Sequence, residues 1–240
     1  VRVTVCCLIM SYFEGLLLGV VEGLTEFLPV SSSGHLILAR EVLGLNVPEG
    51  LAVDAVLQLA ATLAVLVYFF ADFRKLLGVF INKVRGLPIL SEDKTLFLAI
   101  ALGTIPGLLL GILLEEYMDT VFRSALLVAF ALFFGSALMY IAERLARGGR
   151  ALSVKSGFLI GCFQALALIP GMSRSGATIA GGLLLGLSRE AAARFSFLLS
   201  FPIILGAGSK KLWELWQGGD VALQAGPRVL AFLTAFVVGL

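Results

Sequence analysis

Two glutamates, Glu22 and Glu26, lie four residues apart within an apolar stretch of the chain. On a helix this spacing places both on one face, one turn apart. A lone carboxylate inside a membrane costs about 3 kcal/mol even on lenient scales, and two on one face also repel unless a proton or a cation lies between them. The pair therefore indicates a divalent-metal site, a general acid/base pair or a proton relay. The alternative is that this helix end reaches the lipid headgroups and both carboxylates are solvated.

The residues after Pro29 add hydroxyl groups and an imidazole. The chain there reads VSSSGHL, with Ser31, Ser32 and Ser33 followed by His35, the only histidine of the sequence. A serine at the start of a helix is ordinarily an N-cap, and a lone histidine in apolar surroundings is ordinarily a satisfied core residue. Beside two carboxylates, the cluster predicts a nucleophile or a general base instead, and either Ser32 or His35 can fill that role.

A second polar stretch, PGMSRSGAT, supplies positive charge. Arg174 stands between Ser173 and Ser175, and Thr178 follows one turn later. A helix N-terminus with serines, a glycine and an arginine favours an anion, because N–H groups, hydroxyls and a bidentate guanidinium converge there. We therefore predict a phosphate or diphosphate site formed by Ser31, Ser33, Ser173, Arg174, Ser175 and Thr178. The alternative is that the arginine only pairs with a glutamate of the first stretch and holds the two stretches together.

Composition places both stretches in a membrane protein. Of the 240 residues, 59% are hydrophobic and only 14% are charged, whereas a soluble domain averages about 25% charged residues. The net charge of +2 and the absence of a dense basic block give no indication of a nucleic-acid partner. We therefore expect the chain to be surrounded by membrane lipids and to bind no nucleic acid.

The apolar runs predict how the chain crosses a bilayer, since a span needs about 20 mostly apolar residues. Clear candidate runs occur near 51–71, 95–114, 123–143 and 190–208, and a fifth begins near 227. Two further runs contain prolines that disfavour a continuous helix, about 8–43 with Pro29 and about 155–187 with Pro170. We expect an all-α polytopic membrane protein with two re-entrant helix–break–helix hairpins in addition to its transmembrane helices.

The connecting segments predict the orientation of the spans. The segments 72–94 and 144–155 are basic, whereas 115–123 between them is mainly acidic. The positive-inside rule places basic loops in the cytoplasm. We therefore expect 72–94 and 144–155 to be cytoplasmic loops and 115–123 to be an external one.

The two interrupted stretches resemble each other at a shift of 142 residues. At this shift Gly19 matches Gly161, Glu22 matches Gln164, Ser31 matches Ser173, Ser33 matches Ser175 and Gly34 matches Gly176. An odd number of spans separates the stretches, so the two hairpins enter from opposite sides. This pattern predicts an inverted-topology repeat whose broken helices meet near the midplane and build one site there, and the alternative is chance similarity between Gly/Ser-rich segments. We expect a single membrane domain over 1–240, with one repeat at about 8–143 and a second, C-terminally incomplete, at about 155–240.

The stretches GVVEGLTEFLPVSSSGHL and GCFQALALIPGMSRSGATIAGG resemble the two signatures of the bacterial undecaprenyl-diphosphatase family, the bacitracin-resistance lipid phosphatases. The first matches the family's E/Q-x-x-x-E motif followed by P-V-S-S-x-G-H, and the second matches P-G-x-S-R-S-x-x-T at every fixed position. The similarity extends along the chain and includes REAAARFSFLLSFPI. Carried over by position, the resemblance implies that the site consists of Glu22, Glu26, Ser32, His35, Ser173, Arg174 and Thr178.

The resemblance implies that the chain hydrolyses undecaprenyl diphosphate to the monophosphate, which recycles the carrier lipid of peptidoglycan and other envelope polymers. It also implies a requirement for a divalent cation, Mg²⁺ or Ca²⁺, and an active site on the periplasmic or external side of the bacterial plasma membrane. We expect Glu22 and Glu26 to hold this cation, in keeping with their spacing. The alternative function is a transporter or flippase of a phosphorylated lipid or an anion, because inverted repeats with broken helices are typical of transporters. The choice between a Ser32 and a His35 nucleophile stays open, as does the choice between a monomer and a homodimer.

Overall fold

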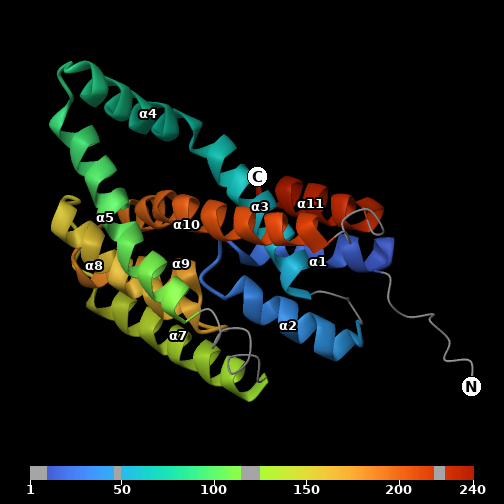
Figure 1. The fold of residues 1–240 in the computed structure, drawn as a ribbon. Helices are drawn as coiled ribbons and strands as arrows, with labels where there is room; N and C mark the ends of the chain where they lie inside the picture. Colours follow the sequence, from blue (N-terminus) through green and yellow to red (C-terminus); the bar gives the residue numbers. More distant parts are fainter. Residues whose placement is uncertain (1–9, 46–49, 115–124, 219–224) are drawn as a thin grey trace, which may run out of the picture.

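The computed structural model describes residues 10–45, 50–114, 125–218 and 225–240, and every statement below concerns these residues. They form helices and no strand (Figure 1), which confirms the all-α class. The helices are α1 (Tyr12–Thr25), α2 (Ser32–Leu43), α3 (Gly50–Tyr68), α4 (Phe70–Arg85), α5 (Ser91–Leu113), α7 (Ala125–Leu145), α8 (Val154–Ala165), the short 3₁₀ helix η1 (Leu166–Leu168), α9 (Arg174–Leu184), α10 (Arg189–Gly218) and α11 (Ala225–Gly239).

Several of these helices suit a membrane. Those long and apolar enough to cross one are Ser91–Leu113, Leu126–Leu145 and Arg189–Lys210, and a fourth crossing results if α3 and α4 are counted as one bent span. Each candidate run expected to span therefore corresponds to a helix, and the run that begins near 227 becomes the shorter apolar helix α11. The chain is a membrane protein by both composition and fold.

The basic loop predicted at 72–94 is largely a helix instead. α4 bends away from α3 by 82° and ends at Gly86, whose φ of 69° closes the last turn. Its apolar residues recur at helical spacing, as in Leu77, Phe80 and Val84, between exposed lysines and arginines. Counting the charged residues alone did not reveal this amphipathic pattern, which is typical of a helix.

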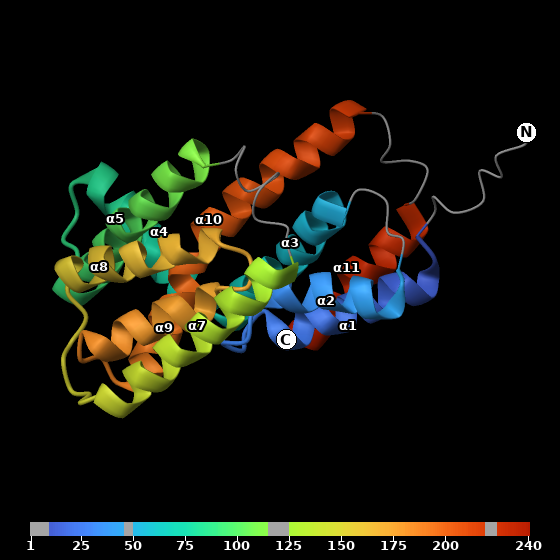
Figure 2. The same cartoon turned by 90° about the horizontal axis from the view of Figure 1, so that it is seen from below.

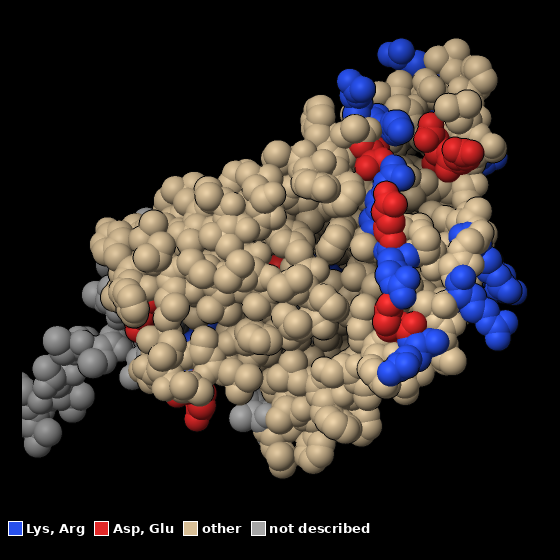
Figure 3. Space-filling model, turned by 180° about the vertical axis from the view of Figure 1, so that it is seen from behind, with Lys and Arg blue, Asp and Glu red and all other residues tan. Residues whose placement is uncertain are grey.

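Charged side chains gather in a belt at one end of the molecule, while most of the remaining surface in the same view is uncharged (Figure 3). Between charged ends, a membrane protein presents apolar side chains to lipid, and exposed Phe133 and Leu109 fit that description. The belt therefore fits one boundary of the bilayer.

Both predicted helix breaks are present. The break after α1 contains Pro29 and lasts until Ser31, and the break after η1 contains Pro170 and lasts until Ser173. Gly171 adopts a φ of 97° there, and a Cβ on it would lie 2.5 Å from the carbonyl oxygen of Val128, so only glycine fits. The chain therefore turns sharply between two short helices at each site.

The predicted N-caps are also present. The side chain of Ser31 accepts a hydrogen bond from the backbone N–H of Gly34 at 3.3 Å, and Ser173 accepts one from Gly176 at 3.0 Å. These bonds satisfy one of the free N–H groups at the start of α2 and of α9. The remaining N–H groups of both helix starts are left for other partners.

Two apolar clusters form the core, one around each interrupted stretch. The helices α1, α2, α3 and α11 surround Leu18, Leu36 and Leu57, while α5, α8, α9 and α10 surround Ile160 and Leu183. The long helix α10 packs against both α3 and α9, and seen from below it runs obliquely across the molecule (Figure 2). The two helix breaks meet between these clusters.

Candidate functional site

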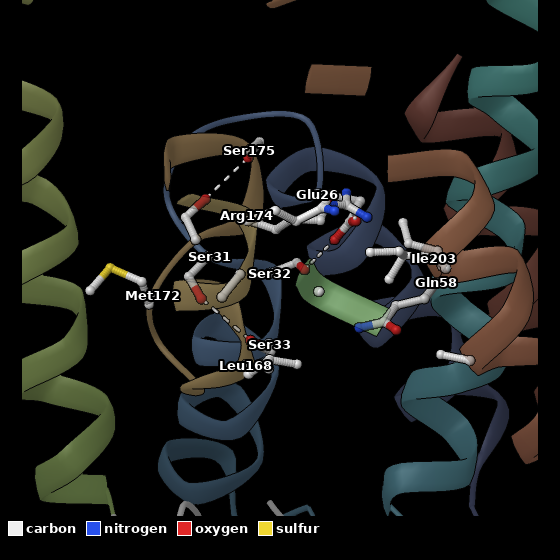
Figure 4. Close-up of a pocket in the computed structure, with 16 residues that line it drawn as sticks. Glu26, Ser31, Ser32, Ser33, Gln58, Leu168, Met172, Arg174, Ser175 and Ile203 are labelled. Atoms are coloured by element: carbon white, nitrogen blue, oxygen red, sulfur yellow. Dashed lines mark hydrogen bonds and ion pairs between the residues drawn. The ribbon is translucent and has the colours of Figure 1, made fainter. Parts of the chain in front are cut away.

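The helix breaks meet around a cavity of about 160 Å³ (Figure 4). The first break and the start of α2 contribute Glu26, Ser31, Ser32 and Ser33, and the second break with the start of α9 contributes Ser173, Arg174 and Ser175. Two amides, Gln58 of α3 and Gln164 of α8, complete the polar wall, and the remaining lining residues are apolar or glycine. This volume holds several water-sized groups.

The carboxylate of Glu26 joins the two stretches. The Nη2 atom of Arg174 donates to its Oε1 at 2.6 Å, and the hydroxyl of Ser32 donates to its Oε2. Glu26 is 8% exposed and Glu22 is 0% exposed, so the alternative of two solvated carboxylates is wrong. A buried carboxylate with two donors, one of them charged, is held firmly in one orientation.

Arg174 therefore makes the ion pair that was one of its two predicted roles. The pair leaves the Nε atom of Arg174 buried and without a hydrogen-bond partner among the described residues. A guanidinium has five N–H donors, and this one also lines the cavity. Arg174 can consequently hold Glu26 and an anion in the cavity together.

The serines of both stretches are arranged in pairs. The hydroxyls of Ser31 and Ser33 lie 3.4 Å apart, those of Ser173 and Ser175 lie 3.1 Å apart, and Ser175 also donates to the carbonyl of Leu28 at 3.0 Å. Among the described residues other than glycine, only Ser31 has a positive φ, of 67°. Such backbone strain costs about 1–3 kcal/mol and clusters at functional sites.

Three predicted site residues lie outside the cavity lining. The two carboxylate oxygens of Glu22 are buried and have no hydrogen-bond partner among the described residues. The Nδ1 atom of His35 lies 2.9 Å from the carbonyl oxygen of Ser31, one turn earlier on α2. The hydroxyl of Thr178 lies 2.6 Å from the hydroxyl of Ser196 on α10, so both fasten α9 to α10.

The oxygens of Glu22 suit a hard divalent cation, because Mg²⁺ and Ca²⁺ prefer carboxylate and carbonyl oxygens. Both oxygens of Glu26 already accept hydrogen bonds, from Arg174 and Ser32. Within the described residues no group of three or more His, Cys, Asp or Glu side chains is found. A cation would therefore take most of its ligands from the substrate or water, and the predicted metal role fits Glu22 better than Glu26.

The two amides of the cavity wall were missed by the motif reasoning. Gln164 had a signal, because the internal alignment pairs it with Glu22. Gln58 had none, since it lies in an apolar run that reads as an ordinary span. Gln58 lies one helical turn after Asp54 on α3. Asp54 forms an ion pair with Arg40 of α2, which holds α2 against α3 beside the cavity.

Comparisons with known proteins identify the family of the chain. The family described as "Bacitracin resistance protein BacA" matches residues 15–240. A protein of Rubrobacter xylanophilus named undecaprenyl-diphosphatase is 45% identical over 236 residues, which cover 96% of this chain and 86% of that protein. Proteins of the same name from Micrococcus luteus and Kineococcus radiotolerans are 41% and 43% identical, over 95% and 96% of this chain and 85% and 82% of their own lengths.

Proposed function

The chain belongs to the BacA family of bacitracin resistance proteins, and we propose that the cavity between its helix breaks is the active site of an undecaprenyl-diphosphatase. The enzyme hydrolyses undecaprenyl diphosphate to undecaprenyl phosphate and phosphate, which returns the lipid carrier to the synthesis of peptidoglycan. The observation that carries the site assignment is Glu26, held between Arg174 of one stretch and the hydroxyl of Ser32 of the other.

The diphosphate docks where positive charge and free donors meet. The starts of α2 and α9 both lie at the cavity, and helix N-termini attract anions through their dipoles and free N–H groups. Arg174 adds a full charge, and Ser173 and Ser175 add hydroxyls. This combination binds a phosphorylated headgroup and orients its terminal phosphorus toward Ser32 across the cavity.

Ser32 is the nucleophile that the geometry supports. Its hydroxyl already donates to Glu26, which accepts the proton as the Ser32 oxygen bonds to the terminal phosphorus. The bond from that phosphorus to the bridging oxygen breaks, and undecaprenyl phosphate leaves with the electron pair. The leaving phosphate takes the proton from Glu26. Water then attacks the phosphorus of the phosphoserine with Glu26 again as the base, the bond to the Ser32 oxygen breaks, and Glu26 returns the proton to that oxygen as phosphate leaves. His35 lies outside the cavity lining and is engaged with a backbone carbonyl, which makes it a supporting residue of α2.

A divalent cation is part of this proposal. Its ligands would include Glu22, whose buried oxygens otherwise lack partners among the described residues. When bound, such a cation would neutralise charge on the diphosphate.

Helix packing supports the inverted repeat. Glycines of α1 approach α11, since a Cβ on Gly19 would lie 2.6 Å from the carbonyl oxygen of Ala231. Glycines of α8 approach α5 in the same way, since a Cβ on Gly161 would overlap the carbonyl oxygen of Gly103. Gly19 and Gly161 are the residues that the shift of 142 pairs. The pair of α1 with α11 thus corresponds to the pair of α8 with α5, as two related halves require.

We place the protein across the bacterial plasma membrane, with the cavity opening to the external side. The two hairpins enter from opposite faces in this arrangement, which brings their helix breaks together near the midplane. The charged belt of Figure 3 then marks the cytoplasmic boundary, where basic residues concentrate.

Phosphate release in detergent tests this function against the transporter alternative. Purified protein with undecaprenyl diphosphate and Mg²⁺ should release phosphate although no membrane separates two compartments. Release should be lost in Arg174→Ala and in Glu26→Ala. A protein that moves the lipid in vesicles but releases no phosphate in detergent would contradict the assignment.

A further inference from the structure

Gln164 is a buried amide in the cavity wall that forms no hydrogen bond with the described residues. It lies on the last turn of α8, is 3% exposed and lines the same cavity as Arg174 and Ser32. Neither its Oε1 nor its Nε2 atom has a hydrogen-bond partner among the described residues. Buried amides are nearly always paired, so an unpaired one indicates a partner that enters from outside the chain.

The packing around this amide keeps space beside it. Gly107 of α5 lies against the side chain, and a Cβ built on Gly107 would lie 3.4 Å from the Nε2 atom of Gln164 and 2.8 Å from the Cδ1 atom of Ile203. Gly107 and Ile203 also line the cavity. A larger residue at position 107 would therefore crowd Ile203 and the Gln164 amide at the cavity wall.

We propose that Gln164 is a substrate-binding residue whose Nε2 atom donates a hydrogen bond to an oxygen of the diphosphate held by Arg174. This inference rests on the proposed function. Diphosphate oxygens are strong acceptors, and the cavity wall contains a second unpartnered donor, the Nε atom of Arg174. An entering diphosphate satisfies both donors at once. The amide carbonyl accepts from a water that accompanies the headgroup.

The substitution Gln164→Met tests this contact, because methionine has nearly the same length and volume but no N–H donor. Gln217→Met is the matched control. Gln217 is exposed on α10, ten residues beyond the cavity residue Ala207, which is about 15 Å along a helix. Two quantities are measured in detergent at fixed Mg²⁺: the rise in melting temperature caused by inorganic pyrophosphate, and the kinetics of phosphate release from undecaprenyl diphosphate.

We expect Gln164→Met to melt at the same temperature as the wild type or higher when no ligand is present, because it removes an unpaired buried amide. The rise caused by pyrophosphate should largely disappear, and kcat/KM should fall about 10- to 100-fold, the usual effect of losing a hydrogen bond to a charged group. Gln217→Met should match the wild type in both measurements.

An unchanged pyrophosphate effect with unchanged kcat/KM would overturn the proposal. A lower melting temperature without ligand, in step with the loss of activity, would also overturn it, because Gln164 would then be structural. A wild-type protein that pyrophosphate stabilises but that releases no phosphate would contradict the proposed function alone. The pyrophosphate effect in Gln164→Met would still decide whether the amide binds a diphosphate.

Discussion

The Nη2 atom of Arg174 lies 2.6 Å from the Oε1 atom of Glu26, although 148 residues separate them in the chain. The pair joins the end of α1 to the start of α9, and the other oxygen of Glu26 accepts a hydrogen bond from the hydroxyl of Ser32. Glu26 therefore has both an electrostatic and a chemical role. It neutralises the partly buried guanidinium of Arg174 before substrate arrives, and it is placed to take a proton when substrate has bound.

Glu26→Gln removes the charge and the proton acceptor of Glu26 but keeps the size of the side chain. It therefore separates the two roles from the packing of the side chain. We expect kcat to fall at least about 100-fold, the lower end for losing a general base. The free energy of unfolding should fall by about 1–3 kcal/mol, because the partly buried guanidinium of Arg174 loses its charge partner. Phosphate release and thermal unfolding in detergent measure the two effects.

The double variant Glu26→Gln/Arg174→Met provides the control for this experiment. Removing both charges should restore part of the stability lost in either single variant, whereas activity should stay low. Losses of stability that simply add in the double variant would show that the two side chains do not interact.

Ser32→Ala tests the nucleophile. It should lower kcat about 1000-fold and abolish a phosphoenzyme trapped with labelled substrate, because no hydroxyl remains beside Glu26. His35→Ala should retain activity within about tenfold, since His35 does not line the cavity. Ser91→Ala, at an exposed serine of α5, is the matched control. An acid-labile phosphoenzyme that disappears in His35→Ala would identify the histidine as the nucleophile instead.

The sequence was sufficient to predict the two helix breaks, because each combines a proline with a cluster of charged and hydroxyl side chains inside an apolar run. Proline alone is not such a signal, since Pro106 and Pro202 lie inside α5 and α10. The sequence also predicted that Arg174 contacts the first stretch, because a guanidinium inside a membrane requires a counter-charge. It could not decide whether that counter-charge is Glu22 or Glu26, since both lie on one helix face. Side-chain packing decides it: Arg174 reaches Glu26, whereas the oxygens of Glu22 have no partner among the described residues.

Thr178 shows a different limit of the motif. Its spacing from Arg174 suggested a phosphate ligand, but that spacing is one helical turn and leaves the direction of the side chain open. In the structure its hydroxyl lies beside Ser196 of α10, which lies outside the two polar stretches. The contact depends on where α10 packs against α9, and the residue pattern of neither helix predicts that packing position.

Cysteine labelling tests the orientation. Glu41 and Lys83 are exposed charged residues in the last turns of α2 and α4. In a variant whose three native cysteines are serine, Glu41→Cys should react with a membrane-impermeant maleimide in intact cells. Lys83→Cys should react only after the cells are permeabilised, because basic segments stay in the cytoplasm. The reverse pattern would place the cavity on the cytoplasmic side.

Gly161→Ala tests whether the contact between α8 and α5 sets the position of the site. The added Cβ would overlap the carbonyl oxygen of Gly103, so the helices must separate, and such overpacking costs about 1–3 kcal/mol. Gly206→Ala on α10 is the control, because a Cβ there meets nothing within 4 Å and alanine favours a helix by about 1 kcal/mol.

If the two halves are related as proposed, Gly19→Ala should destabilise the protein as much as Gly161→Ala. Its Cβ would lie 2.6 Å from the carbonyl oxygen of Ala231 on α11. Thermal unfolding of the three variants in detergent measures the differences. Equal stability of Gly161→Ala and Gly206→Ala would show that α8 can move away from α5 at no cost. A change in Gly161→Ala that is absent in Gly19→Ala would count against the equivalence of the two helix pairs.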